Sequence, residues 1–373
     1  MKKNHLTILP IILIVVLSVI SCKKEPSADP NQTLIDQMKL AADSVIKNVL
    51  VPSLATFVVD HKRGIDWLHV AGISNQKAKA LMDISHTFRI TSCTKTFTLT
   101  ALFQLVDEGN ISLNDKFSEY YLEYPASDSI TVLMLSNMTN GINNYFNDDH
   151  WQNSMKTTPF RIWAPKEFAD ISFSHPLEFR PDAKYRYSNV NTITIGMTIE
   201  KVMDNFLESE IGSHIIKLQP LTNSGFLRNR TKLSGIHRRG CNLGRLDLTS
   251  DFTESFNLSN CWAAESVYTT PHELQAYTER IVKGKFPSDS LQYRRLNYDF
   301  HDTSPIHSYG IGISKLASFY GHNGIIWEYP TSICPDKDYT VIIYHNPCQP
   351  STYAPNNLFR KSLLILYGSS NDT

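Results

Sequence analysis

The chain has 373 residues, 42% of them hydrophobic, with 36 basic and 36 acidic side chains and a formal net charge of zero. A balanced charge provides no overall positive field for nucleic acid, and the apolar fraction is enough to build a folded core. The length is large for one simple domain and ordinary for a core that carries a long insertion.

The first 21 residues have the pattern of a lipoprotein signal peptide. Two lysines near the start precede a mostly apolar run over residues 6–20, which is short for a membrane span. The residues before Cys22 resemble a bacterial lipobox, in which the cysteine is lipidated and becomes the mature N-terminus. Residues 22–32 would then form a polar tether. We expect a lipid-anchored protein of the bacterial cell envelope that faces the periplasm or the cell exterior; the alternative is an uncleaved signal anchor with an incidental cysteine.

The next segment predicts one helix and one hairpin. Residues 33–50 place apolar side chains at the spacing of an amphipathic helix. Residues 54–60 and 66–72 are short runs rich in β-forming side chains, and a polar turn that ends in glycine joins them. We therefore expect the folded domain, residues 33–373, to begin with a helix and an antiparallel strand pair.

A candidate nucleophile opens the following helix. Residues 92–95 read Ser-Cys-Thr-Lys and lead into residues 96–108, which have helical apolar periodicity. At a spacing of three, Ser92 and Lys95 share one helix face, so the amine can reach the hydroxyl. A serine hydroxyl needs a base, and a lysine kept neutral by burial can supply one. The alternative is an ordinary helix N-terminal serine beside a lysine that extends to solvent.

The C-terminal segment predicts three strands and a helix. Residues 309–314, 325–333 and 339–345 are rich in strand-forming side chains. Residues 355–367 begin with proline and are followed by Gly368, which are the start and stop signals of a closing helix.

These elements place strands at both ends of the chain and mostly helical patterns between them. We predict an α+β fold in which an antiparallel sheet, built from both chain ends, is flanked by the N-terminal and C-terminal helices. The sheet and its helices would take residues 33–90 and 306–373. The mostly helical insertion would take residues 91–305.

The six cysteines have different expected roles. Cys22 is assigned to the lipid, and Cys93, one residue beyond Ser92, points elsewhere on the helix and is interpreted as packing. In an exported protein the other four could form disulfides, with three possible pairings that the sequence does not rank. They are Cys241, Cys261, Cys334 and Cys348. The closest two histidines, His301 and His307, are too far apart for one-turn metal ligation, so no metal is expected.

Three short segments carry a resemblance to a known superfamily. Residues 88–98 resemble the nucleophile segment of the serine β-lactamase and penicillin-binding superfamily, and more narrowly of its class C β-lactamase and D-alanyl-D-alanine carboxypeptidase-like branch. Residues 185–189, Tyr-Arg-Tyr-Ser-Asn, are similar to the Tyr-x-Asn element of that branch. Residues 320–324, Tyr-Gly-His-Asn-Gly, stand where the family has Lys-Thr-Gly or His-x-Gly. The resemblance spans roughly residues 54–367 and implies a β-lactamase/transpeptidase-like fold.

The resemblance implies three catalytic residues. Ser92 would be the acylated nucleophile, and Lys95 its base partner. Tyr187, as a phenolate or through a proton shared with Lys95, would activate Ser92 and later the deacylating water.

The resemblance also implies a binding and stabilising set. Asn189 would hydrogen-bond Lys95 and the substrate amide, and His322 would line the site and assist proton transfer near neutral pH. Gly324 belongs to the same strand-edge element as His322. The oxyanion hole would be formed by the backbone N–H groups of Ser92 and Ile325.

The sequence therefore predicts an exported serine hydrolase that forms an acyl-enzyme at Ser92 and uses no cofactor. Its substrate would be an amide or ester: a D-Ala-D-Ala-type peptide, a small ester or a β-lactam. The alternative is a catalytically inactive, lipid-anchored binding protein that keeps the fold. The presence of the whole residue set favours the enzyme, whereas the physiological substrate and the oligomeric state are not set by the sequence.

Overall fold

The computed structural model describes most of the chain between residues 30 and 366. The segments outside the described part are 1–29, 49–52, 76–77, 219–220, 230–232, 234–236, 238–255, 306, 317–318, 325–330, 336–338, 346–357, 359–360, 363 and 367–373. The expected signal peptide, Cys22 and Ile325 therefore lie outside the described residues. For residues 331–335 and 339–345 the backbone alone is described.

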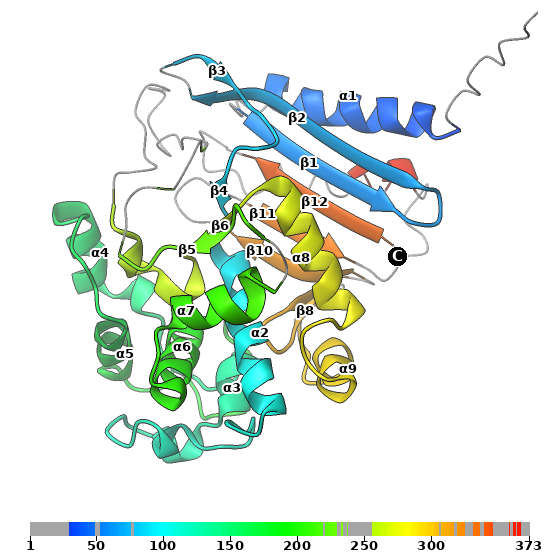
Figure 1. The fold of residues 1–373 in the computed structure, drawn as a ribbon. Helices are drawn as coiled ribbons and strands as arrows, with labels where there is room; N and C mark the ends of the chain where they lie inside the picture. Colours follow the sequence, from blue (N-terminus) through cyan, green and yellow to red (C-terminus); the bar gives the residue numbers. More distant parts are fainter. Residues whose placement is uncertain are drawn as a thin grey trace, which may run out of the picture.

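The main sheet has nine strands in the order β3-β2-β1-β12-β11-β10-β9-β8-β7, so its middle joins the two ends of the chain (Figure 1). Its strands are β1 (Ser53–Asp60), β2 (Ile65–Asn75), β3 (Ala80–Leu81), β7 (His301–Ser304), β8 (His307–Tyr309), β9 (Ser314–Leu316), β10 (Phe319–Gly324), β11 (Thr331–Pro335) and β12 (Tyr339–His345). All neighbouring strands are antiparallel, and β1 pairs with β2 on one side and with β12 on the other.

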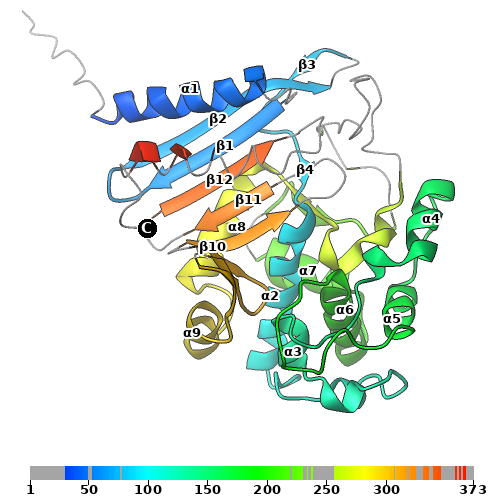
Figure 2. The same cartoon turned by 180° about the vertical axis from the view of Figure 1, so that it is seen from behind.

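Both faces of β1 are covered, which explains why the strand is buried along its whole length. Leu54 and Val58 lie in one apolar cluster with Met38 of the N-terminal helix α1 (Gln32–Asn48). Phe57 points to the other face and stacks on His272 of α8 (Pro271–Lys283), with ring centroids 5.7 Å apart. Figure 2 shows α1 along the outer strands, α8 behind the sheet, and α2 to α7 gathered on the side of the molecule away from α1.

The insertion consists mainly of helices and a small second sheet. Its helices besides α8 are α2 (Thr94–Asp107), α3 (Val132–Ser136), α4 (Asp149–Thr157), α5 (Pro165–Phe173), α6 (Asn189–Met203), α7 (Leu207–Ile211) and α9 (Asp289–Asn297). The small sheet has the order β4-β6-β5, with β4 (Phe88–Arg89), β6 (Val267–Thr269) and β5 (Gly225–Phe226). Helix α2 is buried on nearly all sides, including Lys95 and four threonines in its first half. Among the described residues, no helix is both long and apolar enough to cross a membrane.

The predicted fold class is confirmed, and so are the first helix, the first hairpin and the helix that follows Ser92. The single strand predicted at residues 309–314 is wrong, because Tyr309 ends β8, Ser314 begins β9, and residues 310–313 form the bend between them. Ile311 and Ile313 alternate as in a strand, but Gly312 has a φ of +62°, and a Cβ there would collide with Leu99. The C-terminal part of the main sheet also includes β7, so it begins before residue 306, the boundary predicted from the sequence. Parts of the predicted strand 325–333 and of the closing helix lie outside the described residues.

Candidate active site

Ser92 lies in a single 3₁₀ turn, η1 (Thr91–Cys93), directly before α2. Thr91 has a φ of +49°, a left-handed conformation that is unusual for a β-branched residue. Neighbouring backbone holds the turn in place: the N–H of Ile90 donates to the carbonyl of Val267 at 3.1 Å, and the N–H of Val267 donates to Thr94 Oγ1 at 3.0 Å. Strained residues persist where the surroundings over-determine them, and they are common at active sites.

The predicted proximity of Ser92 and Lys95 is observed. Lys95 Nζ lies 3.0 Å from Ser92 Oγ and donates a second hydrogen bond to the carbonyl oxygen of Ala264 at 3.3 Å. The lysine side chain is completely buried. Burial lowers the pKa of Lys95 to about 8, and the negative charge of Glu265 opposes this shift.

Glu265 is the site residue that the sequence did not reveal. The Ser92 hydroxyl donates to Glu265 Oε1 at 2.8 Å, and the same oxygen lies 3.8 Å from Lys95 Nζ. Burial raises the pKa of Glu265 to about 7, against the opposing effects of Lys95 and of the Ser92 hydrogen bond. Its second oxygen, Oε2, has no hydrogen-bond partner among the described residues. The one signal in the sequence is an acidic residue inside the otherwise apolar or small run 261–267.

The segment that carries Glu265 is held against both α2 and α6. The 3₁₀ turn η7 (Trp262–Ala264) precedes it, and Trp262 has a φ of +32°. The Thr98 hydroxyl on α2 donates to the carbonyl of Ala263 at 2.7 Å. On the other side, a Cβ at Gly196 of α6 would lie 2.8 Å from the Ala263 Cβ, so glycine permits this close approach.

Tyr187 approaches the same group from the residues before α6. Lys95 Nζ lies 5.2 Å from the centre of the Tyr187 ring, within the range of a cation–π contact. Burial raises the pKa of Tyr187 well above its ordinary value, although the neighbouring Ser92 hydroxyl acts in the opposite direction. The free site therefore holds Tyr187 as a neutral phenol rather than as a phenolate.

His322 lies on β10 and is buried. Its Nδ1 is 2.5 Å from the carbonyl oxygen of Asn323, and its Nε2 is 3.2 Å from Tyr309 Oη. Because a carbonyl oxygen only accepts, Nδ1 carries the proton and Tyr309 donates to Nε2. Burial, with the charge of Lys95, lowers the pKa of His322 to about 3. The imidazole is therefore a weak base near neutral pH, which argues against the expected role of His322 in proton transfer.

Gly324 brings the end of β10 directly onto the nucleophile turn. A Cβ at this position would collide with Thr91 Oγ1, and would lie 2.6 Å from the carbonyl oxygen of Ile90 and 3.0 Å from the backbone nitrogen of Ser92. Only glycine fits such an approach. The Ser92 N–H thus lies where a strand edge meets a helix N-terminus, whereas the expected partner Ile325 is outside the described residues.

Asn189 begins α6 and is buried, but it does not bond Lys95 in the part of the chain described. Its Oδ1 is without a hydrogen-bond partner among these residues. The expected Asn189–Lys95 hydrogen bond is replaced by the bond from Lys95 to the Ala264 carbonyl.

The two cysteines with described side chains are buried and form no disulfide among the described residues. Cys93 Sγ donates to the backbone carbonyl of His322 at 3.1 Å, which agrees with a packing role. Cys261 lies beside Glu265 and Asn260 and hydrogen-bonds rather than forming a disulfide, so the expectation of four pairing cysteines is corrected for Cys261. Within the described residues, no group of three or more His, Cys, Asp or Glu side chains could hold a metal ion.

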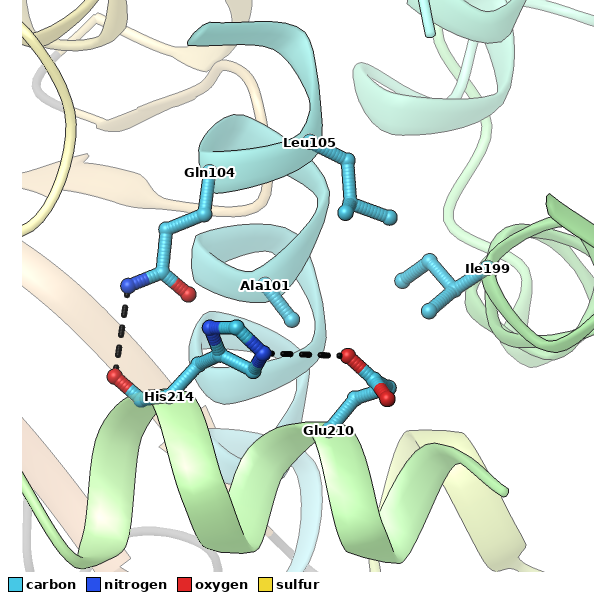
Figure 3. Close-up of a pocket in the computed structure, with 6 residues that line it drawn as sticks. All are labelled: Ala101, Gln104, Leu105, Ile199, Glu210 and His214. Atoms are coloured by element: carbon cyan, nitrogen blue, oxygen red, sulfur yellow. Dashed lines mark hydrogen bonds and ion pairs between the residues drawn. The ribbon is translucent and has the colours of Figure 1, made fainter. Parts of the chain in front are cut away.

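A second polar cluster lies at the other end of α2 (Figure 3). Gln104 donates to the backbone carbonyl of His214 at 3.2 Å, and His214 Nε2 lies 3.3 Å from Glu210 Oε2. The other carboxylate oxygen of Glu210 accepts from Asn205 at 2.6 Å. The helix rise of about 1.5 Å per residue places this cluster roughly 18 Å from Ser92.

Comparison with known proteins places this arrangement in a family. Residues 42–363 match the Beta-lactamase family, so the chain belongs to it.

Individual relatives agree with this placement. The Bacillus subtilis (strain 168) protein named "Putative penicillin-binding protein PbpX" is 22% identical over 240 residues, which is 64% of this chain and 56% of the relative. The Dichelobacter nodosus protein named "Probable fimbrial assembly protein FimD, serogroup H1" is 30% identical over 34% of this chain and 32% of its own length. The chain thus spans about half or less of these relatives.

Solved structures share the fold. The D-amino acid amidase from Ochrobactrum anthropi SV3, complexed with L-phenylalanine amide, superposes with a TM-score of 0.79 at 19% identity, covering 90% of this chain and 98% of the amidase. A penicillin-binding protein from Bacillus halodurans superposes with a TM-score of 0.72 at 19% identity, over 86% and 98% of the two chains.

Proposed function

We propose that this protein is a serine hydrolase that forms an acyl-enzyme at Ser92 and hydrolyses an amide or an ester. The observation that carries the proposal is the pair of hydrogen bonds at one hydroxyl: Lys95 at 3.0 Å and Glu265 at 2.8 Å, both nearly or fully buried. A serine between a cation and an acid, at the start of a buried helix, is arranged to lose its proton and attack a carbonyl.

The chemistry would proceed in two halves. Ser92 Oγ bonds to the carbonyl carbon, the Ser92 N–H helps to hold the developing oxyanion, and the amine or alcohol departs with a proton. Water then attacks the carbonyl carbon of the acyl-enzyme, the bond from that carbon to Ser92 Oγ breaks, and Ser92 regains a proton as the acid leaves. The substrate classes that we propose are D-Ala-D-Ala-type peptides, amides of D-amino acids, small esters and β-lactams. A D-amino acid amidase and a penicillin-binding protein among the structural neighbours support the amides and the β-lactams.

A covalent probe tests the acyl-enzyme. Full-length protein is incubated with a fluorophosphonate and with a penicillin, and adducts are mapped by mass spectrometry in wild type and in Ser92→Ala. We expect a single adduct on Ser92 that the variant lacks. If the folded wild type forms no adduct with any probe, and ligand affinity is the same in Ser92→Ala, the chain is a binding protein instead.

We further propose that the chain is exported and anchored to the cell envelope by lipid on Cys22. The basis is the apolar run followed by the cysteine. Metabolic labelling with a fatty acid should mark the wild type and not Cys22→Ala. Equal labelling of the two would contradict the anchor.

A further inference from the structure

The hydrogen bonds around Ser92 assign a direction to each proton. The Ala264 carbonyl only accepts, so Lys95 donates to it, and a protonated lysine also donates to Ser92 Oγ. The single proton of Ser92 is directed at the ionised Oε1 of Glu265 at 2.8 Å, and Tyr187, the other neighbour of this hydroxyl, is held as a phenol. In this state a cationic Lys95 has no lone pair with which to take the proton.

The other candidate bases near the nucleophile, Tyr187 and His322, are not available to accept the Ser92 proton. Tyr187 is held as a phenol, because burial raises its pKa well above its ordinary value. His322 Nε2 already accepts from Tyr309, and Nδ1 carries a proton directed at Asn323. Among the described side chains, Glu265 is the group that both touches Ser92 and has a lone pair directed at its proton.

We infer that Glu265 is the general base of acylation, taking the Ser92 proton while Lys95 remains a cation that stabilises the emerging alkoxide. This inference rests on the proposed function. The O–H bond of Ser92 breaks as the proton moves to Glu265 Oε1, and the Oγ–carbonyl carbon bond forms. The bond from that carbon to the leaving nitrogen or oxygen then breaks, and the leaving atom takes the proton from Glu265, which is ionised again.

The surroundings of Glu265 fit this role. The charged and titratable groups that face it are Lys95, Tyr187, Tyr145 and Cys261. Lys95 is the one cation among them, at 3.8 Å, and favours the carboxylate. Burial acts against the carboxylate more strongly than Lys95, Ser92 and Cys261 favour it, so the pKa of Glu265 is raised to about 7. A base whose pKa lies near the working pH is the most effective one.

The test replaces the carboxylate with an amide of the same size. The rate constant for acylation of Ser92 by a fluorophosphonate and by a p-nitrophenyl ester is measured from pH 5 to 10 in full-length wild type, Glu265→Gln and Glu265→Asp. We expect Glu265→Gln to acylate about a hundredfold more slowly or worse. It should also lose the rise in rate near pH 7, with KM little changed, and Glu265→Asp should recover part of the rate.

The control is Glu210→Gln, which removes a buried carboxylate at the far end of α2 and should acylate at the wild-type rate. Infrared difference spectroscopy gives a readout besides activity: a protonated-carboxyl band that appears as the pH falls through about 7 should be present in wild type and absent from Glu265→Gln.

The outcomes separate two failures. If Glu265→Gln has a native circular dichroism spectrum and acylates with the same rate and pH profile as the wild type, the assignment is overturned. Neutral Lys95 or Tyr187 would then be the base. Absence of any Ser92 adduct in wild type overturns the proposed function itself.

Discussion

A buried glutamate from another part of the chain lies near each end of helix α2. The two glutamates differ in how many of their carboxylate oxygens have a hydrogen-bond partner. At the C-terminal end, both oxygens of Glu210 have partners, Asn205 and His214. At the N-terminal end, Glu265 bonds Ser92 through one oxygen and leaves the other without a partner among the described residues. A carboxylate that serves stability is fully paired. A carboxylate that acts in catalysis keeps an oxygen that can still accept a proton, and this incomplete pairing lowers the stability of the fold.

The largest expected difference between the two ends comes from adding one methyl group to each. Gly324→Ala forces β10 away from Thr91 and from the Ser92 nitrogen, so acylation should fall about a hundredfold or more. Gly212→Ala, in the π-helical turn η5 (Gly212–Ile216) after α7, meets no atom within 4 Å and should leave acylation unchanged. Probe labelling kinetics measure both. Equal rates in the two variants would show that the contact of β10 with the turn is dispensable.

The buried histidine gives the second effect, on stability. The pKa of His322 is lowered from its ordinary value of 6.5 to about 3 in the folded protein. Between these two pH values, the histidine therefore binds a proton in the unfolded chain but not in the folded one. Stability from this group is therefore present above pH 6.5 and is lost as the pH falls toward 3. Between pH 7 and pH 5 the wild type should lose about 2 kcal/mol that His322→Gln does not, at about 1.4 kcal/mol per pKa unit. Urea unfolding at a series of pH values measures it, and parallel curves would contradict it.

A smaller effect should follow from shifting Glu265 without removing it. A Cβ in Gly196→Ala would lie 2.8 Å from Ala263 and 3.0 Å from the Trp262 ring, so η7 must move by a few tenths of an ångström. We expect acylation to slow about tenfold, since small displacements of catalytic groups are costly. The protein should still fold, as thermal unfolding can verify. Wild-type kinetics in a folded variant would show that the position of η7 does not matter.

The smallest effect is expected at the far end of the helix. Glu210→Gln removes the partner of a histidine whose side chain is 37% exposed, so solvent screens part of the interaction. The free energy of unfolding should fall by about 1 kcal/mol, measured by urea denaturation. A loss of stability alone agrees with a structural role, whereas a change in the pH profile of acylation would contradict the contrast between the two ends.

The sequence predicted the parts of the site that depend on local geometry. One helical turn places Ser92 and Lys95 in contact whatever the rest of the fold does, and the first hairpin follows from alternation around a turn. The place of Tyr187 and His322 came from a resemblance to a known family. The sequence order alone could not place them, because their approach to Lys95 depends on how α6 and β10 pack.

Two features could not be predicted because they exist only in the packed protein. Glu265 is 173 residues from Ser92 in the chain, and nothing in its neighbourhood forms a recognisable motif. The charge state of His322 depends on burial and on Lys95, which a sequence does not display. The error at residues 309–314 has a different origin: alternating isoleucines indicated a strand, while the glycine between them makes the bend.

The order of the strands constrains when this site can exist during synthesis. Leu54, near the start of the domain, pairs with His345, near its end, and β10, which carries His322 and Gly324, is among the last strands to be made. A contact between distant parts of a chain forms late, since the intervening loop must close first. The growing chain can therefore form α2 and hold Ser92 beside Lys95 while the sheet is incomplete, but it cannot close β10 over the nucleophile until residues 319–324 have been made.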